Sequence, residues 1–169
     1  MTVADASHKL EGAIERARRL MFELRPEVLE RHGLAAAMQI LTTDGPWEEV
    51  NLDIQMSRQS ETVEALCYRT LRELVVNARK HSNAHTLRVF GCESNGRLDL
   101  RVEDNGDGFD PSEALSGHDA DLHLGLRTVV ARVRMAGGAV VVNSCRGAGT
   151  TVQVHLPAEP RKPSPATTS

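Results

Sequence analysis

The sequence has few aromatic residues, a small net charge and no long apolar run. Aromatic residues make up 3% of its 169 residues, too few for the stacking surfaces on which single-stranded nucleic acids bind. The formal net charge is −3, which argues against a partner held through phosphate contacts. No apolar run approaches the roughly 20 residues that cross a bilayer, and the first residues contain no apolar signal-peptide segment. We therefore expect a cytoplasmic protein with no membrane segment and no nucleic-acid partner.

Cysteine is also scarce, and two common phosphate-binding motifs are missing. Cys67, Cys92 and Cys145 are too few and too widely spaced for a zinc knuckle or a disulfide framework. We expect them to be reduced and mostly buried. Neither GxxxxGK(S/T) nor GxGxxG occurs in the chain, which excludes P-loop and Rossmann phosphate sites.

Helical periodicity dominates the N-terminal third. Apolar residues recur there at alternating spacings of four and three: Leu10, Ile14, Ala17, Met21 and Leu24. This stripe is typical of an ordinary packed helix or of one half of a dimerisation hairpin, and we favour the second, with a homodimer as its consequence. We assign residues 1–41 to this helix and a linker, residues 46–157 to one domain, and the proline-rich residues 158–169 to a disordered tail.

The pattern of residues 46–157 predicts an α+β domain. Alternating apolar residues predict a strand near 50–56, and a long helix follows over 61–81. Two strands come next, joined by a short turn at 94–96, and then a helix over 124–135. A final hairpin closes around the glycines of RGAGT. We expect a two-layer sandwich in which helices cover one face of a mixed, mostly antiparallel sheet.

The helix over 61–81 carries polar residues opposite its apolar face. These are Glu73, Asn77, Lys80 and His81, and such a face is often simply solvated. The residue types nevertheless suggest chemistry. A carboxylate and an amide oxygen one turn apart suit Mg²⁺ or its bound waters, and a lysine one turn further on suits a phosphate.

A second feature is the run DNGDGF, which starts at Asp104 directly after a predicted strand. Such residues are common in tight turns, and a calcium loop is a rival interpretation. The calcium loop fails because an EF-hand needs oxygen ligands where this chain has Gly106, Gly108 and Leu115. What remains is a carboxylate beside two positions without side chains. That arrangement lets a flat ligand lie against the backbone while Asp104 accepts a hydrogen bond, for example from an adenine amine.

Two further glycine motifs follow, each weak by itself. Gly125 and Leu126 lie near the predicted start of the second long helix, where backbone N–H groups bind anions. Gly149 and Thr150 belong to a glycine turn that places a hydroxyl at the start of the last strand.

The order of the four motifs is specific. Glu-x-x-x-Asn on a helix, Asp-x-Gly-x-Gly after a strand, Gly-Leu near a helix start and Gly-x-Gly-Thr before the last strand resemble the Bergerat ATP-binding fold of gyrases, heat-shock chaperone ATPases, MutL proteins and histidine kinases. Within this family, the sequence most resembles the sensor histidine kinases of the nitrate-sensor and DesK-like class. It rests on RELVVNARKHSNA, LRVEDNGDGF, HLGLRTVVARVRMAGG and GAGTTVQVHLP, and the resemblance extends over about residues 10–157.

The resemblance implies a role for each motif. Asn77 would bind Mg²⁺, and Glu73 would help to hold or polarise a metal-bound water. Lys80 and His81 would face the phosphates of ATP, with Glu73 and Lys80 as the catalytic residues. Asp104 would bind the adenine amine, with Gly106 and Gly108 giving the base room. Thr150 would support Asp104, directly or through water, and Gly149 of the same turn would also belong to the cofactor site. Gly125 and Leu126 would close the phosphate end, and residues 110–122 would form a mobile lid.

One departure from the family pattern concerns the phosphorylated histidine. The resemblance implies a histidine followed by an acidic residue on the first dimerisation helix, but here His8 precedes Lys9, and the His118–Asp119 pair falls in the expected lid. We therefore expect an ATP-dependent histidine kinase domain that does not phosphorylate itself alone. Its acceptor histidine domain would lie upstream or on another chain, with a response regulator as further partner. The alternatives are a nucleotide-binding module without kinase activity and a serine kinase similar to anti-sigma factors.

Overall fold

The computed structural model describes residues 26–112 and 120–161, and for residues 120–124 the backbone alone. In chain order its elements are α2 (Glu27–Thr43), β1 (Glu49–Gln55), α3 (Glu61–His81), β2 (Thr86–Ser94), β3 (Arg97–Asp104), α5 (Ala120–Met135), β4 (Ala139–Ser144) and β5 (Thr150–Pro157). These elements confirm the expected strands and helices, and α3 has the bounds that its pattern predicts.

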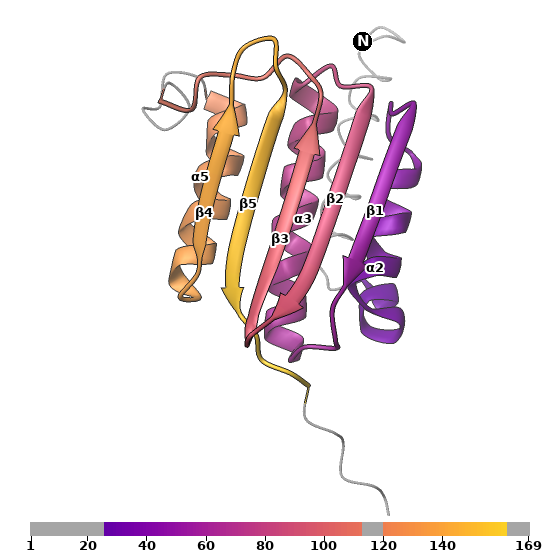
Figure 1. Ribbon diagram of the computed structural model, residues 1–169. Helices are drawn as coiled ribbons and strands as arrows, with labels where there is room; N and C mark the ends of the chain where they lie inside the picture. Colours follow the sequence, from indigo (N-terminus) through magenta and orange to yellow (C-terminus); the bar gives the residue numbers. More distant parts are fainter. Residues whose placement is uncertain (1–25, 113–119, 162–169) are drawn as a thin grey trace, which may run out of the picture.

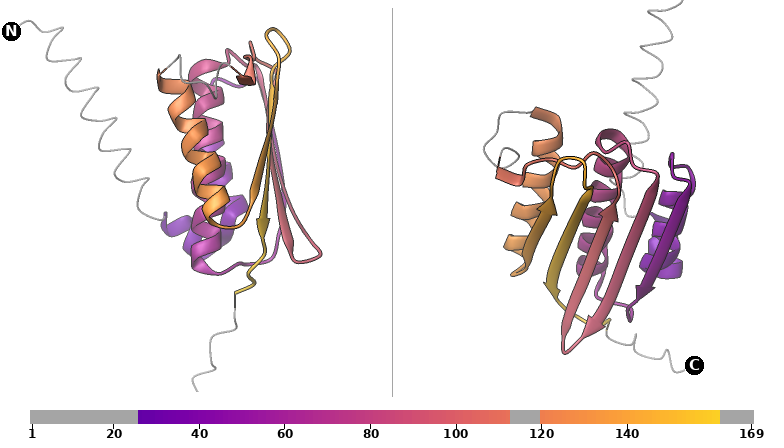
Figure 2. Two further views of the ribbon diagram at one scale, coloured as in Figure 1. Left: turned by 90° about the vertical axis from the view of Figure 1, so that its left-hand side faces the viewer. Right: turned by 45° about the horizontal axis from the view of Figure 1, so that its top comes forward.

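The five strands form one mixed sheet in the order β1-β2-β3-β5-β4. β1 and β2 are parallel because α3 connects them as a crossover, and the other neighbours are antiparallel. The helices α2, α3 and α5 lie on one face of the sheet, as Figure 1 and the side view in Figure 2 show. The expected two-layer α+β sandwich is confirmed.

α3 is the central helix of the covering layer. The Ser60 side chain caps it by accepting a hydrogen bond from the Val63 N–H, which satisfies one of the free donors of the first turn. Its apolar face, including Cys67, Leu71 and Val75, is buried against the sheet. α3 therefore holds its last turn, with Asn77, at a defined place over the sheet.

α2 belongs to the same globular unit. We expected the domain to begin at residue 46, but Leu29, Leu34, Ala37 and Met38 of α2 are part of the common hydrophobic core. Gly33 interrupts the helix with a φ of 82°, a left-handed conformation that favours glycine. The expected apolar stripe over residues 10–24 lies outside the described residues.

The first residues of the expected disordered tail are ordered. The Ala158 N–H donates to the Gly96 carbonyl, and the backbone of Glu159 and Arg161 pairs with Ser60 and Arg58. The prediction of disorder is therefore wrong for residues 158–161, while 162–169 lie outside the described part.

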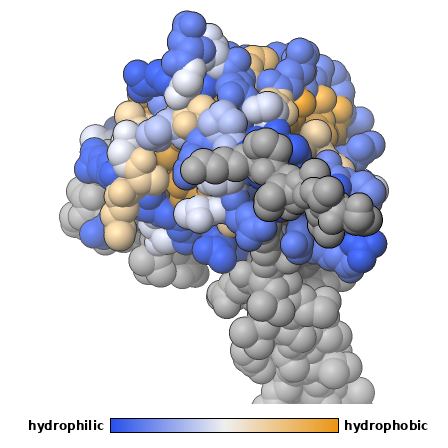
Figure 3. Space-filling view, turned by 90° about the horizontal axis from the view of Figure 1, so that it is seen from below, coloured by the Kyte–Doolittle hydropathy of each residue, from blue (hydrophilic) through white to orange (hydrophobic). Residues whose placement is uncertain are grey.

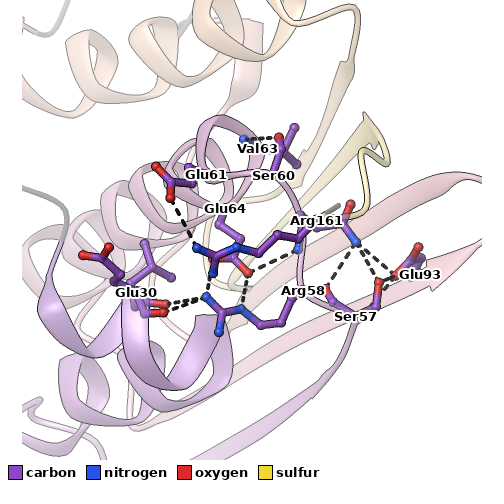
Figure 4. Close-up of polar contacts among 11 residues, drawn as sticks. Glu30, Ser57, Arg58, Ser60, Glu61, Val63, Glu64, Glu93 and Arg161 are labelled. Atoms are coloured by element: carbon purple, nitrogen blue, oxygen red, sulfur yellow. Dashed lines mark hydrogen bonds and ion pairs between the residues drawn. The ribbon is translucent and has the colours of Figure 1, made fainter. Parts of the chain in front are cut away.

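This C-terminal segment belongs to a polar network, which we call the clasp: Arg58, Gln59, Glu64, Glu93 and residues 158–161 (Figure 4). Gln59 is 1% exposed. Its amide oxygen accepts from the Glu159 N–H at 2.8 Å, and its amide nitrogen donates to Glu93 Oε2 at 3.1 Å. The buried amide of Gln59 thus has one hydrogen-bond partner in the C-terminal segment and another on β2, as a buried polar group requires.

Arg58 and Glu64 form the charged part of the clasp. The Glu64 side chain is 4% exposed and accepts from Arg58 Nε at 2.5 Å and Nη2 at 3.0 Å. Arg58 Nη2 also donates to the Glu30 carbonyl at 2.8 Å, which lies just before the kink at Gly33. The clasp therefore joins α2, α3, β2 and the C-terminal segment.

The surface at one end of the domain is mostly hydrophilic. Seen from the end where β5 leaves the sheet, hydrophobic side chains gather only in separate patches (Figure 3). Cys67 is buried, and burial raises the pKa of its thiol to about 12. Cys145 is exposed, contrary to our expectation of mostly buried thiols. No helix in residues 26–112 and 120–161 combines the length and apolar character needed to cross a membrane.

Candidate functional site

The motifs predicted from the sequence meet at one end of the sandwich. β3 and β4 end there, β5 begins there, and α3 ends behind the sheet at the same level, at the top of Figure 1. These elements enclose an open hollow of about 530 Å³. Its polar lining includes Asn77, His81, Asp104 and Thr150, all four of them predicted site residues.

Apolar side chains complete the hollow. Leu126 of α5, Phe109 after β3 and Val102 of β3 contribute to its walls. Leu126 is a predicted site residue, whereas Phe109 and Val102 were not singled out from the sequence. A polar edge beside apolar walls suits a flat ligand with hydrogen-bonding groups on its rim.

Asp104 is the acidic group of the hollow. Its Oδ1 accepts a hydrogen bond from the Gly106 N–H at 2.9 Å. Burial raises the pKa of the Asp104 carboxyl above its usual value, while hydrogen bonds from Gly106 and from the Ser82 side chain lower it in part. A carboxylate held in this way is an acceptor for a ligand that brings its own N–H donor.

Thr150 is the direct partner of Asp104 across the β3–β5 ladder. Directly paired residues present their side chains to the same face of a sheet, so the two line the hollow together. The Thr150 hydroxyl lies 2.9 Å from the hydroxyl of Ser144, and Ser144 Oγ also accepts from the Phe109 N–H at 2.9 Å. The expectation that Thr150 supports Asp104, directly or through water, stays a prediction; the contact that the structure shows for its hydroxyl is with Ser144. No motif marked Ser144, because a serine at a strand end has no distinctive pattern.

The glycines of the site are required by close backbone approaches. A Cβ at Gly106 would lie 2.0 Å from the Ser82 carbonyl oxygen, and one at Gly149 would lie 2.2 Å from that of Asp104. Gly108 has a φ of 62°, and a Cβ there would lie 2.0 Å from the Cys145 carbonyl oxygen. The missing side chains of Gly106 and Gly108 make room for the chain itself, and Gly108 also lines the hollow. That these glycines give a base room stays a prediction.

Asn77 and Glu73 face α5 at the other side of the hollow. A Cβ at Gly125 would lie 2.4 Å from Glu73 Oε1, 3.1 Å from Asn77 Nδ2 and 3.2 Å from Asn77 Oδ1, so both side chains end beside this glycine. α5 begins at Ala120, earlier than the predicted start at 124. The N–H groups of Gly125 and Leu126 therefore lie within the helix and not among the free donors of its first turn.

Lys80 and His81 lie in the last turn of α3, and both are exposed. His81 lines the hollow, and Lys80 does not. Most of the expected lid, residues 113–119, lies outside the described residues.

A metal ion would find oxygen donors here and no complete cage. Among the described residues, no group of three or more His, Cys, Asp or Glu side chains could hold a metal. Mg²⁺ commonly binds one or two protein oxygens and takes its other ligands from water and substrate phosphates. The side chains of Glu73 and Asn77, which end beside Gly125, offer one carboxylate and one amide oxygen for that mode of binding.

A second hollow, of about 440 Å³, lies beside the kink of α2 and is lined by clasp residues, including Arg58 and Glu64. It contains none of the predicted site residues. The hollow at Asp104 is therefore the candidate site.

Comparison with known proteins agrees with this geometry. The model of the histidine kinase-, DNA gyrase B- and HSP90-like ATPase family matches residues 62–160, more than half of the chain. The chain belongs to this family. It carries an ATP-binding catalytic domain of the sensor histidine kinase type, and the hollow at Asp104 lies in the matched region.

Curated relatives support the assignment. The domain is 33% identical over 169 residues to the sensor histidine kinase MctS of Rhizobium johnstonii, covering 96% of this chain and 36% of the relative. It is 30% identical over 158 residues to the sensor histidine kinase LiaS of Bacillus subtilis, covering 92% of this chain and 42% of that protein. The chain thus spans well under half the length of these relatives.

Solved structures share the fold of the domain. The Acinetobacter baumannii histidine kinase AdeS matches with a TM-score of 0.62 at 15% identity, over 93% of this chain and 86% of that one. The blue-light activated histidine kinase EL346 of Erythrobacter litoralis matches with a TM-score of 0.58 at 22% identity, over 73% of this chain and 42% of that one. These likenesses concern the fold alone.

Proposed function

We propose that the domain binds Mg-ATP in the hollow at Asp104 and transfers the γ-phosphoryl group to a histidine outside this chain. The observation that carries the proposal is that Asn77 and Asp104, from different elements, line one hollow with apolar walls. Adenine would lie at the Asp104 end, and the phosphates would extend toward α3 and α5. The names of the curated relatives, sensor histidine kinases, support the kinase reaction.

Each polar residue then has a distinct task. The Asp104 carboxylate accepts a hydrogen bond from the adenine amine, while Leu126 and Phe109 contact the base. Asn77 and Glu73 would hold Mg²⁺ or its waters, and the bound metal would supply charge neutralisation at the phosphates. His81 lines the hollow, Lys80 precedes it in the last turn of α3, and we propose that both face the phosphates of ATP. Catalysis on this arrangement consists mainly of positioning and charge neutralisation.

The acceptor histidine and the response regulator would act as partners. No histidine followed by an acidic residue occurs in residues 26–112 and 120–161. We propose that the acceptor lies upstream or on a second chain, that residues 1–25 contribute to a homodimer, and that the reaction takes place in the cytoplasm.

Calorimetric titration with Mg-ATP tests the nucleotide site. We expect a dissociation constant between micromolar and millimolar for the unchanged chain. Asp104→Ala is expected to abolish measurable binding, because a site built around a hydrogen bond discriminates strongly when that bond is lost. Glu61→Ala, an exposed position at the far end of α3, serves as the control. Near-normal affinity in Asp104→Ala contradicts the adenine assignment.

Incubation with γ-labelled ATP separates the kinase from a nucleotide-binding module without kinase activity. The chain alone is expected to remain unlabelled and to label an added histidine-phosphotransfer domain from a related kinase. Acid-labile label on the chain alone contradicts the external acceptor. Acid-stable label on a serine would favour the serine-kinase alternative.

A further inference from the structure

Ser144 ends β4 next to the adenine end of the proposed site. It is half-buried and does not itself line the hollow. Its side-chain oxygen makes three contacts: the Phe109 N–H donates to it at 2.9 Å, the Thr150 hydroxyl lies at 2.9 Å, and the Gly149 carbonyl oxygen accepts from it at 3.1 Å. Thr150 and Phe109 both line the hollow. Ser144 therefore acts on the site only through its neighbours.

The number of hydrogens on each hydroxyl determines which group donates and which accepts in this cluster. A serine hydroxyl has one hydrogen to donate and two lone pairs that accept. Gly149 is buried, and its carbonyl needs a donor, which the Ser144 hydroxyl supplies. With its hydrogen used there, the Ser144 oxygen accepts from the Phe109 N–H and from the Thr150 hydroxyl. The hydrogen of Thr150 thus points toward Ser144, and only lone pairs of its oxygen remain for the hollow.

The hollow then presents two acceptors side by side. Thr150 is paired directly with Asp104 across the ladder, and the Asp104 carboxylate also only accepts. A purine with an amine at position 6 brings two N–H donors to this edge. A purine with a carbonyl at position 6 brings an acceptor, which faces two other acceptors.

We propose that Ser144 is a positioning residue that fixes Thr150 as an acceptor and so sets the preference of the site for a 6-amino purine over a 6-oxo purine. This inference rests on the proposed ATP site and deepens it. In Ser144→Ala the Thr150 hydroxyl is released from its partner and turns to donate to a 6-oxo group. One hydrogen bond gained by the wrong base corresponds to about tenfold in relative affinity.

The test compares ATP with inosine triphosphate, in which the 6-amino group is replaced by an oxo group. Dissociation constants are measured by calorimetry with Mg²⁺ on the full chain. The ratio of the ATP and inosine triphosphate affinities is expected to fall about tenfold in Ser144→Ala. It is expected to stay near the original value in Ser144→Thr, which keeps the hydroxyl. An unchanged ratio in Ser144→Ala overturns the inference, and so does an equal loss of affinity for both nucleotides, which a purely structural role would produce.

A double-mutant cycle separates an effect of Ser144 through Thr150 from a general effect on folding. Thr150→Val removes the hydroxyl through which Ser144 is inferred to act. Adding Ser144→Ala to Thr150→Val is then expected to leave the ratio unchanged, and a further tenfold fall contradicts action through Thr150. The outcome also separates the two levels of the proposal. An unchanged chain that binds neither nucleotide contradicts the proposed function itself, whereas binding with a ratio insensitive to Ser144 contradicts only this inference.

Discussion

Asp104 on β3 and Thr150 on β5 are direct partners in the antiparallel ladder, and both line the hollow beneath α3. The ladder continues from this pair into the buried pair of Val102 and Val152. Asp104 and Thr150 are thus the polar end of a row of side chains on this face of β3 and β5, which continues with apolar residues. The core fixes the position of both side chains, so the site is preorganised by packing.

Removing the Asn77 amide is expected to reduce the dependence of ATP binding on Mg²⁺. Asn77→Ala deletes the amide oxygen that we assign to Mg²⁺. Loss of a residue that only orients a metal ligand typically costs about 10- to 100-fold in metal affinity, so losing the ligand itself is expected to cost at least as much. Calorimetric titrations with and without Mg²⁺ measure the effect. Arg69→Ala, an exposed position on the same helix, serves as the control. The same Mg²⁺ dependence in Asn77→Ala and in the unchanged chain would count against the assigned role.

Asp104→Asn is expected to stabilise the fold while weakening ATP binding. Burial raises the pKa of this carboxyl, so its charged form is disfavoured in the folded state. Its contribution to stability is largest below the unfolded-state pKa and is lost as the pH rises through the raised pKa of the folded state. Thermal unfolding at pH 7 should therefore show a higher midpoint for Asp104→Asn, with the difference shrinking toward pH 3. A lower midpoint at pH 7 contradicts this reading.

Nucleotide binding should show the opposite dependence on pH. The acceptor form of Asp104 is the carboxylate, so ATP affinity is expected to fall as the pH drops through its raised pKa. Titrations between pH 4 and pH 7 on the unchanged chain measure this. An affinity that does not decline at low pH would show that the carboxylate is not the acceptor.

Breaking the charged part of the clasp is expected to destabilise the domain strongly. Arg58→Ala leaves the Glu64 carboxylate without this partner at 4% exposure, a change that typically costs about 3–5 kcal/mol. The control is Arg161→Ala, which removes the ion pair between Arg161 and Glu61. The Arg161 side chain is 39% exposed and that of Glu61 is 62% exposed, so this pair should contribute less than about 1 kcal/mol. Urea unfolding compares the two. Similar losses in both variants would mean that burial of Glu64 does not decide the effect.

Two glycines of the site should respond differently to alanine. In Gly106→Ala the new Cβ meets the backbone oxygen of Ser82 at 2.0 Å, and we expect a loss of about 3 kcal/mol in the free energy of unfolding. In Gly125→Ala the nearest atom is the end of the flexible Glu73 side chain, which can turn away. That variant should keep its stability but bind Mg-ATP more weakly. Equal stability of the two variants contradicts the packing argument.

Much of the fold follows from local sequence patterns. The core stripe of α3 has helical period, and the strand pair β2–β3 alternates around the Asn95–Gly96 turn, where both residues adopt positive φ. Such signals act within a few residues of each other, so the elements and their types are set locally. The order of the motifs likewise predicted Asn77, Asp104 and Thr150 as site residues, and all three line one hollow.

Long-range contacts escaped the sequence analysis. Residues 158–161 carry the composition of a tail, yet Glu159 donates to Gln59, and the bond exists only because β5 ends beside the start of α3. The same holds for α2, whose Leu29 and Met38 looked like linker residues until the fold supplied a core to receive them.

The sequence by itself determined which residue types stand at the strand and helix ends, because those depend on neighbours along the chain. The tertiary structure alone decided which hydroxyl Thr150 contacts, what the glycines make room for and how far α5 extends toward Asn77. Each of these depends on backbone segments brought together by burial of the common core, and no local pattern encodes that proximity.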